Sequence, residues 1–480
     1  MFQEWSDIFF LLIIGIYLIT LLSIVTVVIL ENRHPIRSIA WIVTLVFLPI
    51  VGLFFYMVFG QNFRQRKKIH KLSIRNQDEI KQQDEPYDVA KIEQFTDSIN
   101  TSGLIRLLYN NNEAFPYENS QIDIFTNGRK TFQAIFDDIK KAKDHIHIEF
   151  YIIVDDEVGN RLRDILIQKA KEGVTVRVIY DYWGSFKLKK EFIQPMVIAG
   201  VNLRAFFPPQ FPYFLSKINY RNHRKLVVVD GQIAYTGGIN MADRYLKGDL
   251  LGQWRDTMVR FEGSAVFGLQ ETFISDWFFV DRNMLTEKRY FPTPKISGKN
   301  LVQLVDAGPD TEWMSIMHGI YFAITTAKAY IYIQTPYFMP TEVILTAMET
   351  AALRGLDVRL MLPKKSDTSM ARSSNASYIQ VMLNAGVKVY LYDNGFLHSK
   401  TIVIDDMIST VGTSNMDFRS YEQNFEVNAF IYEKETALKL KTIFFNDLAF
   451  STEITEEQWR KRPRIKKINE SFSRLFSPMM

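Results

Sequence analysis

The feature that most constrains this chain is an eight-residue pattern that occurs twice. The first copy runs HRKLVVVD from His223 to Asp230, and the second runs HSKTIVID from His398 to Asp405. Both read HxKxxxxD, and each continues at the same spacing with a glycine and an asparagine, namely Gly237 with Asn240 and Gly412 with Asn415. A matching motif with a matching continuation indicates a duplicated unit.

The apolar run after each motif lysine is short and β-branched, which predicts a buried strand. His and Lys are two positions apart and share one face of an extended strand, whereas Asp230 and Asp405 lie at an odd offset and point to the other face. We therefore expect these two aspartates to be structural. If the copies face each other across a pseudo-twofold axis, one site gathers two imidazoles and two ammonium groups: His223, Lys225, His398 and Lys400.

With these paired motifs the chain resembles the phospholipase D superfamily, and over nearly its whole length it is similar to the bacterial cardiolipin synthases. The resemblance implies an enzyme whose catalytic motif residues are His223, Lys225, Asp230, His398, Lys400 and Asp405. It also implies that the N-terminal copy carries the nucleophile, so that His223 forms a phosphohistidine and His398 acts as acid and base.

Phosphodiester chemistry explains why these residue types are needed. The anionic oxygens repel a nucleophile and the alkoxide is a poor leaving group, so the first must be neutralised and the second protonated. We expect the non-bridging oxygens to be held by Lys225, Asn240, Lys400 and Asn415, in place of the magnesium of many phosphoryl-transfer enzymes. No cofactor and no metal are then expected. In-line displacement uses one histidine as nucleophile and the other as proton donor.

An acidic residue behind each imidazole would orient the ring. Candidates are Asp256 in the segment QWRD and Glu426 in the segment NFE, each in an apolar stretch downstream of one motif, and both resemble the family's acidic partner of the catalytic histidine. A surface carboxylate, or an ion-pair partner of Arg255, is the alternative for either. Glu149 is a weaker candidate because its counterpart in the repeat is Gln334. The remaining histidines are interpreted as ordinary polar residues: His34, His70, His145, His147 and His318.

The repeat extends beyond the motifs and predicts the fold class. Strand patterns at 145–151 and 174–180 recur at 330–336 and 356–362 with helical stretches between them, which indicates α/β structure. We expect two homologous phospholipase D-like halves with pseudo-twofold symmetry, each with a mixed sheet between helices. The predicted boundaries are 1–60 for a membrane hairpin, 61–120 for a basic linker, 121–290 for the first half and 291–480 for the second half with a basic tail. Residues 282–300 are expected to connect the halves.

Two apolar runs near the N-terminus predict a transmembrane hairpin. Residues 8–30 and 36–59 are each long enough to span a bilayer, and only five residues separate them. A cleaved signal peptide is the alternative for the first run, but no basic segment precedes it. More lysines and arginines follow the second run than lie in the short loop, so the positive-inside rule predicts a multi-pass protein of the cell membrane with a cytoplasmic catalytic part. The basic stretch 61–85 and the tail 460–476 are either solvated or in contact with anionic lipid.

Composition excludes several classes. The chain of 480 residues has no cysteine, which excludes disulfides, zinc bound by cysteine and thiol nucleophiles, and its formal charge of +4 does not indicate a nucleic-acid surface. The leading prediction is a membrane phosphatidyltransferase that converts two phosphatidylglycerol molecules into cardiolipin and glycerol. A hydrolytic phospholipase D, a phosphatidylserine synthase and a nuclease use the same motifs, and a non-enzymatic anionic-lipid scaffold is the alternative outside enzymes. An oligomer is compatible with all of these.

Overall fold

The computed structural model describes residues 2–30, 35–48, 52, 99–209, 219–295 and 298–477. The chain divides into two compact units, one of Met1–Lys68 with Pro209–Asn219, and the other of Ile69–Pro208 with Tyr220–Met480. Each unit is described by itself. The second contains all of the predicted site residues.

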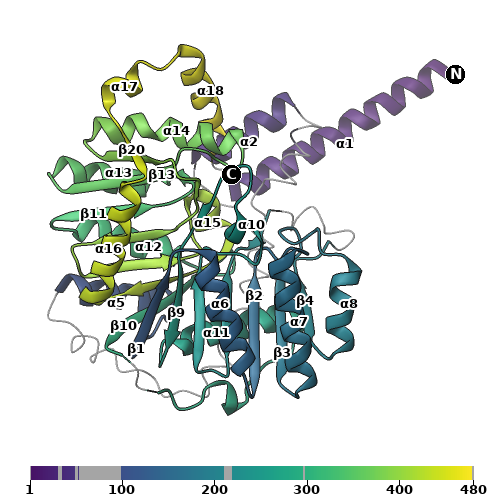
Figure 1. The fold of residues 1–480 in the computed structure, drawn as a ribbon. Coiled ribbons are helices and arrows are strands. Elements are labelled where there is room, and N and C mark those ends of the chain that lie inside the picture. The colour runs from purple at the N-terminus through teal and green to yellow at the C-terminus, as the bar shows by residue number, and fades with distance from the viewer. Residues whose placement is uncertain are drawn as a thin grey trace. The chain divides into compact units, whose positions relative to one another are not determined.

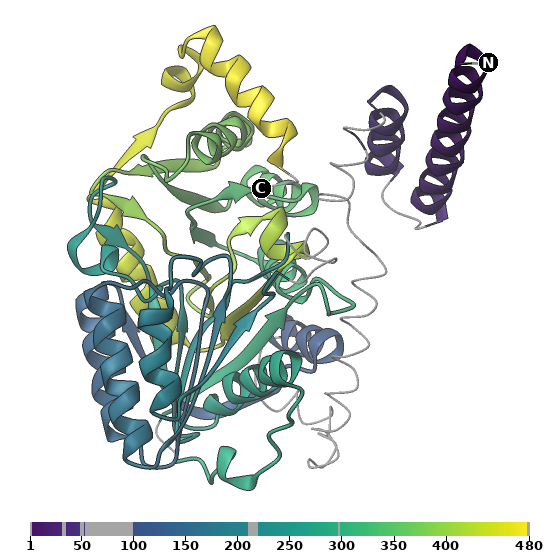
Figure 2. The same ribbon diagram turned by 90° about the vertical axis from the view of Figure 1, so that its right-hand side faces the viewer.

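In the first unit, α1 (Phe2–Leu30) and α2 (Pro35–Phe47) lie side by side (Figures 1 and 2). A search of the described helices finds none with the combination of length and apolar character that crossing a membrane requires. The loop 31–34 and most of 49–59 lie outside the described residues, as does the basic stretch 61–85. The transmembrane hairpin stays a prediction.

The second unit contains the two predicted α/β halves. The first half comprises β1 (Pro116–Phe125), α6 (Gly128–Lys141), β2 (His145–Phe150), α7 (Glu157–Lys171), β3 (Thr175–Asp181), α8 (Lys190–Ile198), β4 (Asn202–Phe206), β5 (Arg221–Asn222), β6 (Lys225–Val229), β7 (Ile233–Gly237), α10 (Arg244–Lys247), β8 (Trp254–Arg255), β9 (Met258–Glu262) and α11 (Val266–Asp281). A short 3₁₀ turn, η2 (Lys288–Tyr290), precedes the second half.

The second half repeats this order of elements. It comprises β10 (Asn300–Ala307), α12 (Ser315–Thr326), β11 (Tyr330–Gln334), β12 (Phe338–Met339), α13 (Glu342–Leu353), β13 (Asp357–Pro363), α14 (Ser369–Asn384), β14 (Lys388–Tyr392), β15 (Phe396–Leu397), β16 (Thr401–Ile404), β17 (Ile408–Gly412), β18 (Met416–Asp417), α15 (Phe418–Glu422), β19 (Asn424–Ile431), α16 (Lys434–Leu448), β20 (Ser451–Ile454), α17 (Glu456–Arg460) and α18 (Arg464–Leu475). The prediction of two homologous α/β halves is confirmed.

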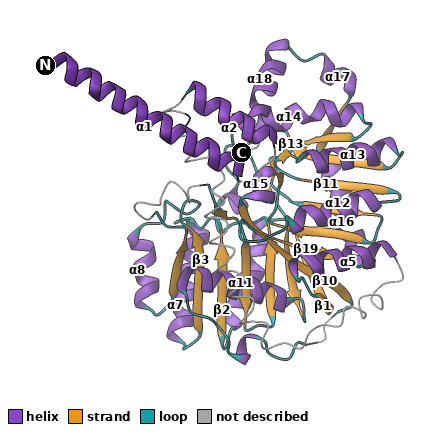
Figure 3. Cartoon of the chain, turned by 180° about the vertical axis from the view of Figure 1, so that it is seen from behind, coloured by secondary structure: helices purple, strands orange, loops and turns teal. Residues whose placement is uncertain are grey.

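One continuous sheet runs through both halves (Figure 3). Its strand order, among the described residues, is β20-β14-β13-β11-β16-β17-β19-β10-β1-β9-β7-β6-β2-β3-β4. The first half thus repeats the second in reverse order, and antiparallel pairing of β1 with β10 joins them at the centre. Within the first half β2, β3 and β4 are parallel while β6 is antiparallel to β2, so the sheet is mixed, as predicted.

The helices cover both faces of the sheet and create three apolar cores. In the first half α6, α7 and α8 cover one face and α11 covers the other (Figures 1 and 3). One core, on the side of α11 and α16, is shared by both halves, since Phe273 of α11 and Phe444 of α16 belong to the same buried cluster. Each half has its own core on the opposite side. The motif strands β6 and β16 both contribute side chains to this shared core, which fixes their positions relative to each other.

Residues at the end of the predicted linker fold onto the second half. Helix α5 (Ile99–Asn112) buries Leu104, Ile105 and Leu108 against α12 and β10. The Gln303 side chain donates a hydrogen bond to the Ile105 carbonyl over 3.1 Å. The expected connection at 282–300 is also anchored, because Leu285 and Tyr290 are buried.

Candidate active site

A short strand delivers the first motif histidine to a carboxylate of the other half. Strand β5 pairs in parallel with the start of β19, and the His223 N–H donates to the Phe425 carbonyl over 2.9 Å. The next residue along β19 is Glu426, and both of its carboxylate oxygens lie 2.9 Å from Nδ1 of His223. The Thr413 hydroxyl donates to the same carboxylate over 2.5 Å. These contacts fix the orientation of the ring.

The second histidine is placed by the same device. Strand β15 pairs in parallel with β8, and the His398 N–H donates to the Arg255 carbonyl over 2.7 Å. Asp256 follows Arg255, and its carboxylate lies 2.6 Å from Nδ1 of His398. The Thr257 N–H holds the other oxygen of Asp256 over 2.7 Å.

Each orienting contact therefore crosses between the halves. Glu426 lies downstream of the second motif but contacts His223, and Asp256 lies downstream of the first motif but contacts His398. In both rings Nδ1 faces a carboxylate, which leaves Nε2 as the nitrogen available to phosphorus. The site consequently requires both halves at once.

The two motif lysines complete a buried cationic cluster. Lys225 and Lys400 are 0 % and 4 % exposed, and each Nζ donates to the carbonyl of its own motif histidine over 2.5 Å. Nζ of Lys400 also lies 3.0 Å and 3.2 Å from the two ring nitrogens of His398. Burying such charges is costly unless an opposite charge accompanies them. An anion is the ligand this cluster favours.

Burial shifts the pKa values of the basic groups. It lowers the pKa of His223 to about 4 and the pKa of Lys400 to about 8. It lowers the pKa values of His398 and Lys225 well below their usual ranges, and the neighbouring positive charges act in the same direction. These shifts favour the neutral form of both imidazoles at pH 7, and a phosphodiester anion beside them favours the protonated form of one of them.

The two carboxylates differ in their protonation behaviour. Burial raises the pKa of Asp256 to about 6. Burial also opposes ionisation of Glu426, but its electrostatic interactions with His223 and Lys225 and the hydrogen bonds from His223 and Thr413 outweigh burial and lower its pKa to about 2. The pseudo-twofold site is therefore electrostatically asymmetric.

The motif asparagines are also placed differently from each other. The Asn240 side chain accepts from the Ile152 N–H over 3.1 Å and donates to the Tyr245 hydroxyl over 3.1 Å, so much of its hydrogen-bonding capacity is already used. The side-chain oxygen of Asn415 is buried and has no hydrogen-bond partner among the residues that the structure describes. A phosphate-binding role for Asn240 would rest on its second amide proton.

The motif aspartates anchor the chain away from the imidazoles. Asp230 accepts hydrogen bonds of 2.8 to 2.9 Å from the backbone N–H groups of 143–145, at the start of β2. Asp405 does the same for residues 328–330 at the start of β11, over 2.6 to 2.9 Å. This placement agrees with the structural role that strand alternation predicts, while the catalytic role that the family resemblance implies for them stays a prediction.

The other candidate acid and the other histidines lie in separate surroundings. Glu149 is buried and accepts from the Asn222 side chain, and burial together with the charge of Asp276 raises its pKa. His145 and His147 are buried beside Gln270, as polar residues of the interior. Among the described residues, no group of three or more His, Asp or Glu side chains is arranged to hold a metal ion.

Two models of known protein families match this chain. A family model described as "Cardiolipin synthase, PLD-like domain" matches residues 135–277 and 320–448, which contain both motifs and both orienting carboxylates. The chain belongs to this family. A second model, described as "Phospholipase_D-nuclease N-terminal", matches residues 15–61.

Relatives of this cardiolipin synthase family align over nearly the full length. The chain is 42 % identical to cardiolipin synthase 2 of Bacillus anthracis, over 95 % of this chain and 89 % of the relative. It is also 42 % identical to the major cardiolipin synthase of Bacillus subtilis, over 97 % and 98 % of the two chains. The crystal structure of a phosphatidylserine synthase from Haemophilus influenzae covers 79 % of this chain and 100 % of its own with a TM-score of 0.61, but only 14 % identity, which indicates a shared fold.

Several site neighbours were not expected from the sequence. Tyr151 packs edge-on against His223 with ring centroids 4.9 Å apart, and Trp254 lies 5.2 Å from the ring of His398. Arg244 stacks over Trp254 at 4.4 Å. A signal was present for the arginine, since Arg244 and Arg419 each follow a motif asparagine by four positions. The aromatic residues carry no comparable signal.

Proposed function

We propose that this chain transfers a phosphatidyl group from one phosphatidylglycerol to the hydroxyl of a second, forming cardiolipin and releasing glycerol. The observation that carries the proposal is the pair of buried imidazoles, each backed by a carboxylate and a lysine, in a chain 42 % identical to named cardiolipin synthases over most of its length. The paired histidines support two successive displacements at one phosphorus.

In the first displacement, Nε2 of His223 attacks phosphorus and the bond to the glycerol oxygen breaks. His398 gives its proton to that oxygen, so glycerol leaves as a neutral alcohol. The ammonium groups of Lys225 and Lys400 bind the non-bridging oxygens and stabilise the charge that develops on them. The product on the enzyme is phosphatidyl-His223.

In the second displacement, the neutral His398 accepts a proton from the terminal hydroxyl of another phosphatidylglycerol. The hydroxyl oxygen bonds to phosphorus, the phosphorus–nitrogen bond breaks, and its electron pair returns to Nε2 of His223. Cardiolipin leaves and both imidazoles regain their starting states. Water or serine in place of the lipid hydroxyl would give the hydrolase or the phosphatidylserine synthase.

A location at the cell membrane follows from the substrates and from two surfaces of the chain. Apolar residues 8–59 overlap the N-terminal family match, and we infer that they anchor the protein with its catalytic part in the cytoplasm. Helix α18 supports a second contact with lipid, because its basic residues accompany an exposed apolar stripe. A nuclease would not need these lipid-facing features, and a lipid scaffold would not need both motifs to be complete.

The proposal is tested with purified full-length protein and labelled phosphatidylglycerol as the sole lipid, followed by separation of lipids and measurement of free glycerol. We expect cardiolipin and glycerol in equal amounts. Phosphatidic acid as the main product would identify a hydrolase. Absence of any lipid conversion, together with nuclease activity, would reject the proposal.

Metal independence is a separate prediction. Since Lys225 and Lys400 provide the positive charge at the phosphate, activity should survive EDTA unchanged within about twofold. The measurement is the initial rate of cardiolipin formation with and without chelator. Loss of activity that one divalent ion specifically restores would contradict it.

A further inference from the structure

Arg244 is held beside the active site by aromatic side chains. Its guanidinium stacks 4.4 Å over Trp254 and lies 5.8 Å from the ring of Tyr245. Among the described residues it forms no salt bridge, and its buried Nε has no hydrogen-bond acceptor. Aromatic faces stabilise such a cation only in part, and an unpaired buried donor is costly. The side chain is therefore prepared to receive an anionic ligand.

The position of Arg244 is on the side of the site that belongs to His398. The Trp254 ring that supports the guanidinium lies 5.2 Å from the imidazole of His398. Its positive charge is also one of the causes that lower the pKa values of His398 and Lys225. The guanidinium and the reacting groups consequently share one electrostatic environment.

The opposite side of the site is built differently. Arg419 occupies the equivalent position of the second half, and its charge acts on Tyr151, whose ring contacts His223. Two positions before each motif histidine stand Arg221 and Phe396 respectively, and the Phe396 ring packs on Trp254 with centroids 4.7 Å apart. The position at which Phe396 packs on the aromatic support of Arg244 is therefore occupied by a charged residue, Arg221, on the other side. We expect the two sides to suit different parts of the substrates.

In-line geometry decides which substrate reaches the Arg244 side. With phosphorus bonded to Nε2 of His223, an acceptor must approach from the opposite side, where His398 takes its proton. A phosphatidylglycerol acceptor differs from water and from glycerol because it carries its own phosphodiester, separated from the attacking hydroxyl by the carbons of its glycerol. A guanidinium fork matches the non-bridging oxygens of such a group.

We propose that Arg244 binds the phosphodiester of the acceptor lipid and thereby selects a second phospholipid over water or free glycerol. This inference rests on the proposed phosphatidyl transfer and identifies a subsite for it. In the transfer step the acceptor hydroxyl bonds to phosphorus, His398 takes its proton, and His223 leaves with the electron pair. Arg244 remains bound to the non-reacting phosphate throughout.

Two reactions of the full-length enzyme separate acceptor binding from the rest of catalysis. One is cardiolipin formation from phosphatidylglycerol in mixed micelles, and the other is exchange of labelled free glycerol into phosphatidylglycerol. Both need phosphatidyl-His223, but only the first has an acceptor with a phosphate. We expect Arg244→Gln to reduce the ratio of cardiolipin formation to glycerol exchange at least about tenfold, as for a lost charged hydrogen bond. Arg244→Lys should retain part of the ratio, because it keeps the charge without the planar fork.

Lys247 offers the matched control. It lies on the same short helix, is exposed, and pairs with Glu157 over 2.7 Å and with Asp243 over 2.8 Å. Lys247→Gln should leave the ratio unchanged. An unchanged ratio in Arg244→Gln and Arg244→Lys would overturn the inference, whether both reactions keep their rates or lose them equally. Thermal melting shows that the variants are folded. A wild-type enzyme that exchanges glycerol without making cardiolipin would instead overturn the proposed function.

Discussion

The two histidine–carboxylate pairs are chemically distinct although they are related by repetition. Glu426, with its pKa lowered to about 2, stays ionised at every pH at which the enzyme works, whereas burial raises the pKa of Asp256 to about 6. A nucleophilic imidazole gains positive charge when it bonds to phosphorus, and a permanently ionised carboxylate stabilises that charge. This asymmetry supports His223 as the nucleophile and His398 as the acid and base.

The first prediction separates these roles. His223→Ala and His398→Ala should each lower turnover about 100- to 10,000-fold without unfolding the protein, because both rings take part in chemistry. After rapid quenching in neutral denaturant, which preserves the acid-labile phosphorus–nitrogen bond, labelled donor lipid should leave more covalent label on His398→Ala than on His223→Ala. The opposite order of labelling would reverse the assignment, and substantial turnover by either variant would reject the mechanism.

The second prediction concerns alkaline pH. Burial lowers the pKa of Lys400 from 10.5 to about 8, so kcat/KM should fall as the pH rises through about 8 and the ammonium loses its proton. Unfolding does not explain this fall, since between pH 8 and 10.5 the unfolded state binds more protons at this group than the folded state. That difference makes the group's contribution to stability rise with pH. Burial lowers the pKa of Lys225 in the same direction.

The measurement is the profile of kcat/KM on micellar phosphatidylglycerol, with the melting temperature recorded at each pH. A flat profile up to about pH 10 would show that neither lysine must be protonated. A fall that follows the melting temperature would assign the effect to unfolding.

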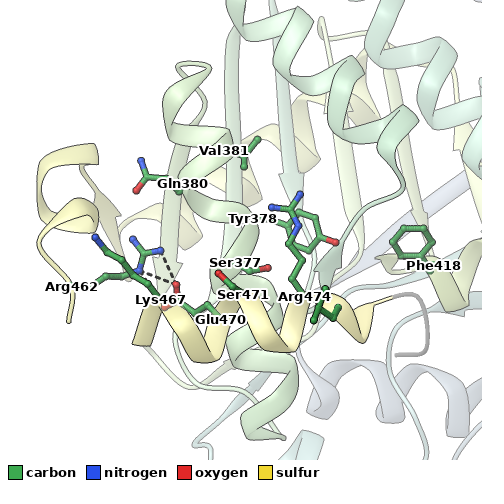
Figure 4. A pocket seen from close by; sticks show the side chains of 11 residues that line it. Ser377, Tyr378, Gln380, Val381, Phe418, Arg462, Lys467, Glu470, Ser471 and Arg474 are labelled. Atoms are coloured by element: carbon green, nitrogen blue, oxygen red, sulfur yellow. Dashed lines mark hydrogen bonds and ion pairs between the residues drawn. The ribbon is translucent and has the colours of Figure 1, made fainter. Parts of the chain in front are cut away.

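At the scale of elements, α18 combines an anchored face with an exposed one. Its inner face packs against α14, where Arg474 stacks 4.4 Å over Tyr378, and Glu470 forms an ion pair of 2.7 Å with Arg462 in the connection just before the helix (Figure 4). Its outer face presents an apolar stripe that is 62 to 73 % exposed, consisting of Ile465, Ile468, Phe472 and Leu475. Exposed apolar side chains at helical spacing with adjacent lysines and arginines are typical of a helix that lies in a lipid surface.

The third prediction tests this surface. Phe472→Glu should weaken binding to anionic vesicles in a sedimentation assay and reduce activity on vesicles more than activity in micelles, because it places a charge on the lipid-facing stripe. Leu353→Glu is the matched control, since Leu353 is 73 % exposed on α13 and does not belong to the stripe. Equal effects of the two substitutions would remove α18 from the proposed contact.

At the scale of the whole chain, every residue given a chemical role lies beyond position 220, within one unit. One large sheet runs through both halves, and the orienting carboxylates are exchanged between the halves. Neither half has a complete site by itself. The N-terminal segment, in contrast, contributes no residue to the proposed chemistry.

The fourth prediction follows from this division. A chain that begins near Asn62 should keep its activity on micellar phosphatidylglycerol and lose efficiency on vesicles, where the substrate must be found in a bilayer. Residual binding to anionic vesicles should persist and weaken with salt, since each basic residue near the surface contributes roughly 1 kcal/mol. A truncated enzyme that folds but is inactive even in micelles would show that the N-terminal segment shapes the site or an essential oligomer.

The sequence by itself determined the duplication and the α/β class, and it predicted the reacting residues and the structural role of Asp230 and Asp405, because strand periodicity and motif spacing are local properties of the chain. Only the tertiary structure decided that Glu426 serves His223 and that Asp256 serves His398. That exchange depends on pairing of β5 with β19 and of β15 with β8, which brings together segments remote in sequence. Only the tertiary structure decided, too, that Arg244 has no salt bridge within the described part of the chain, since ion pairing is a property of the folded surroundings and leaves no pattern in the order of residues.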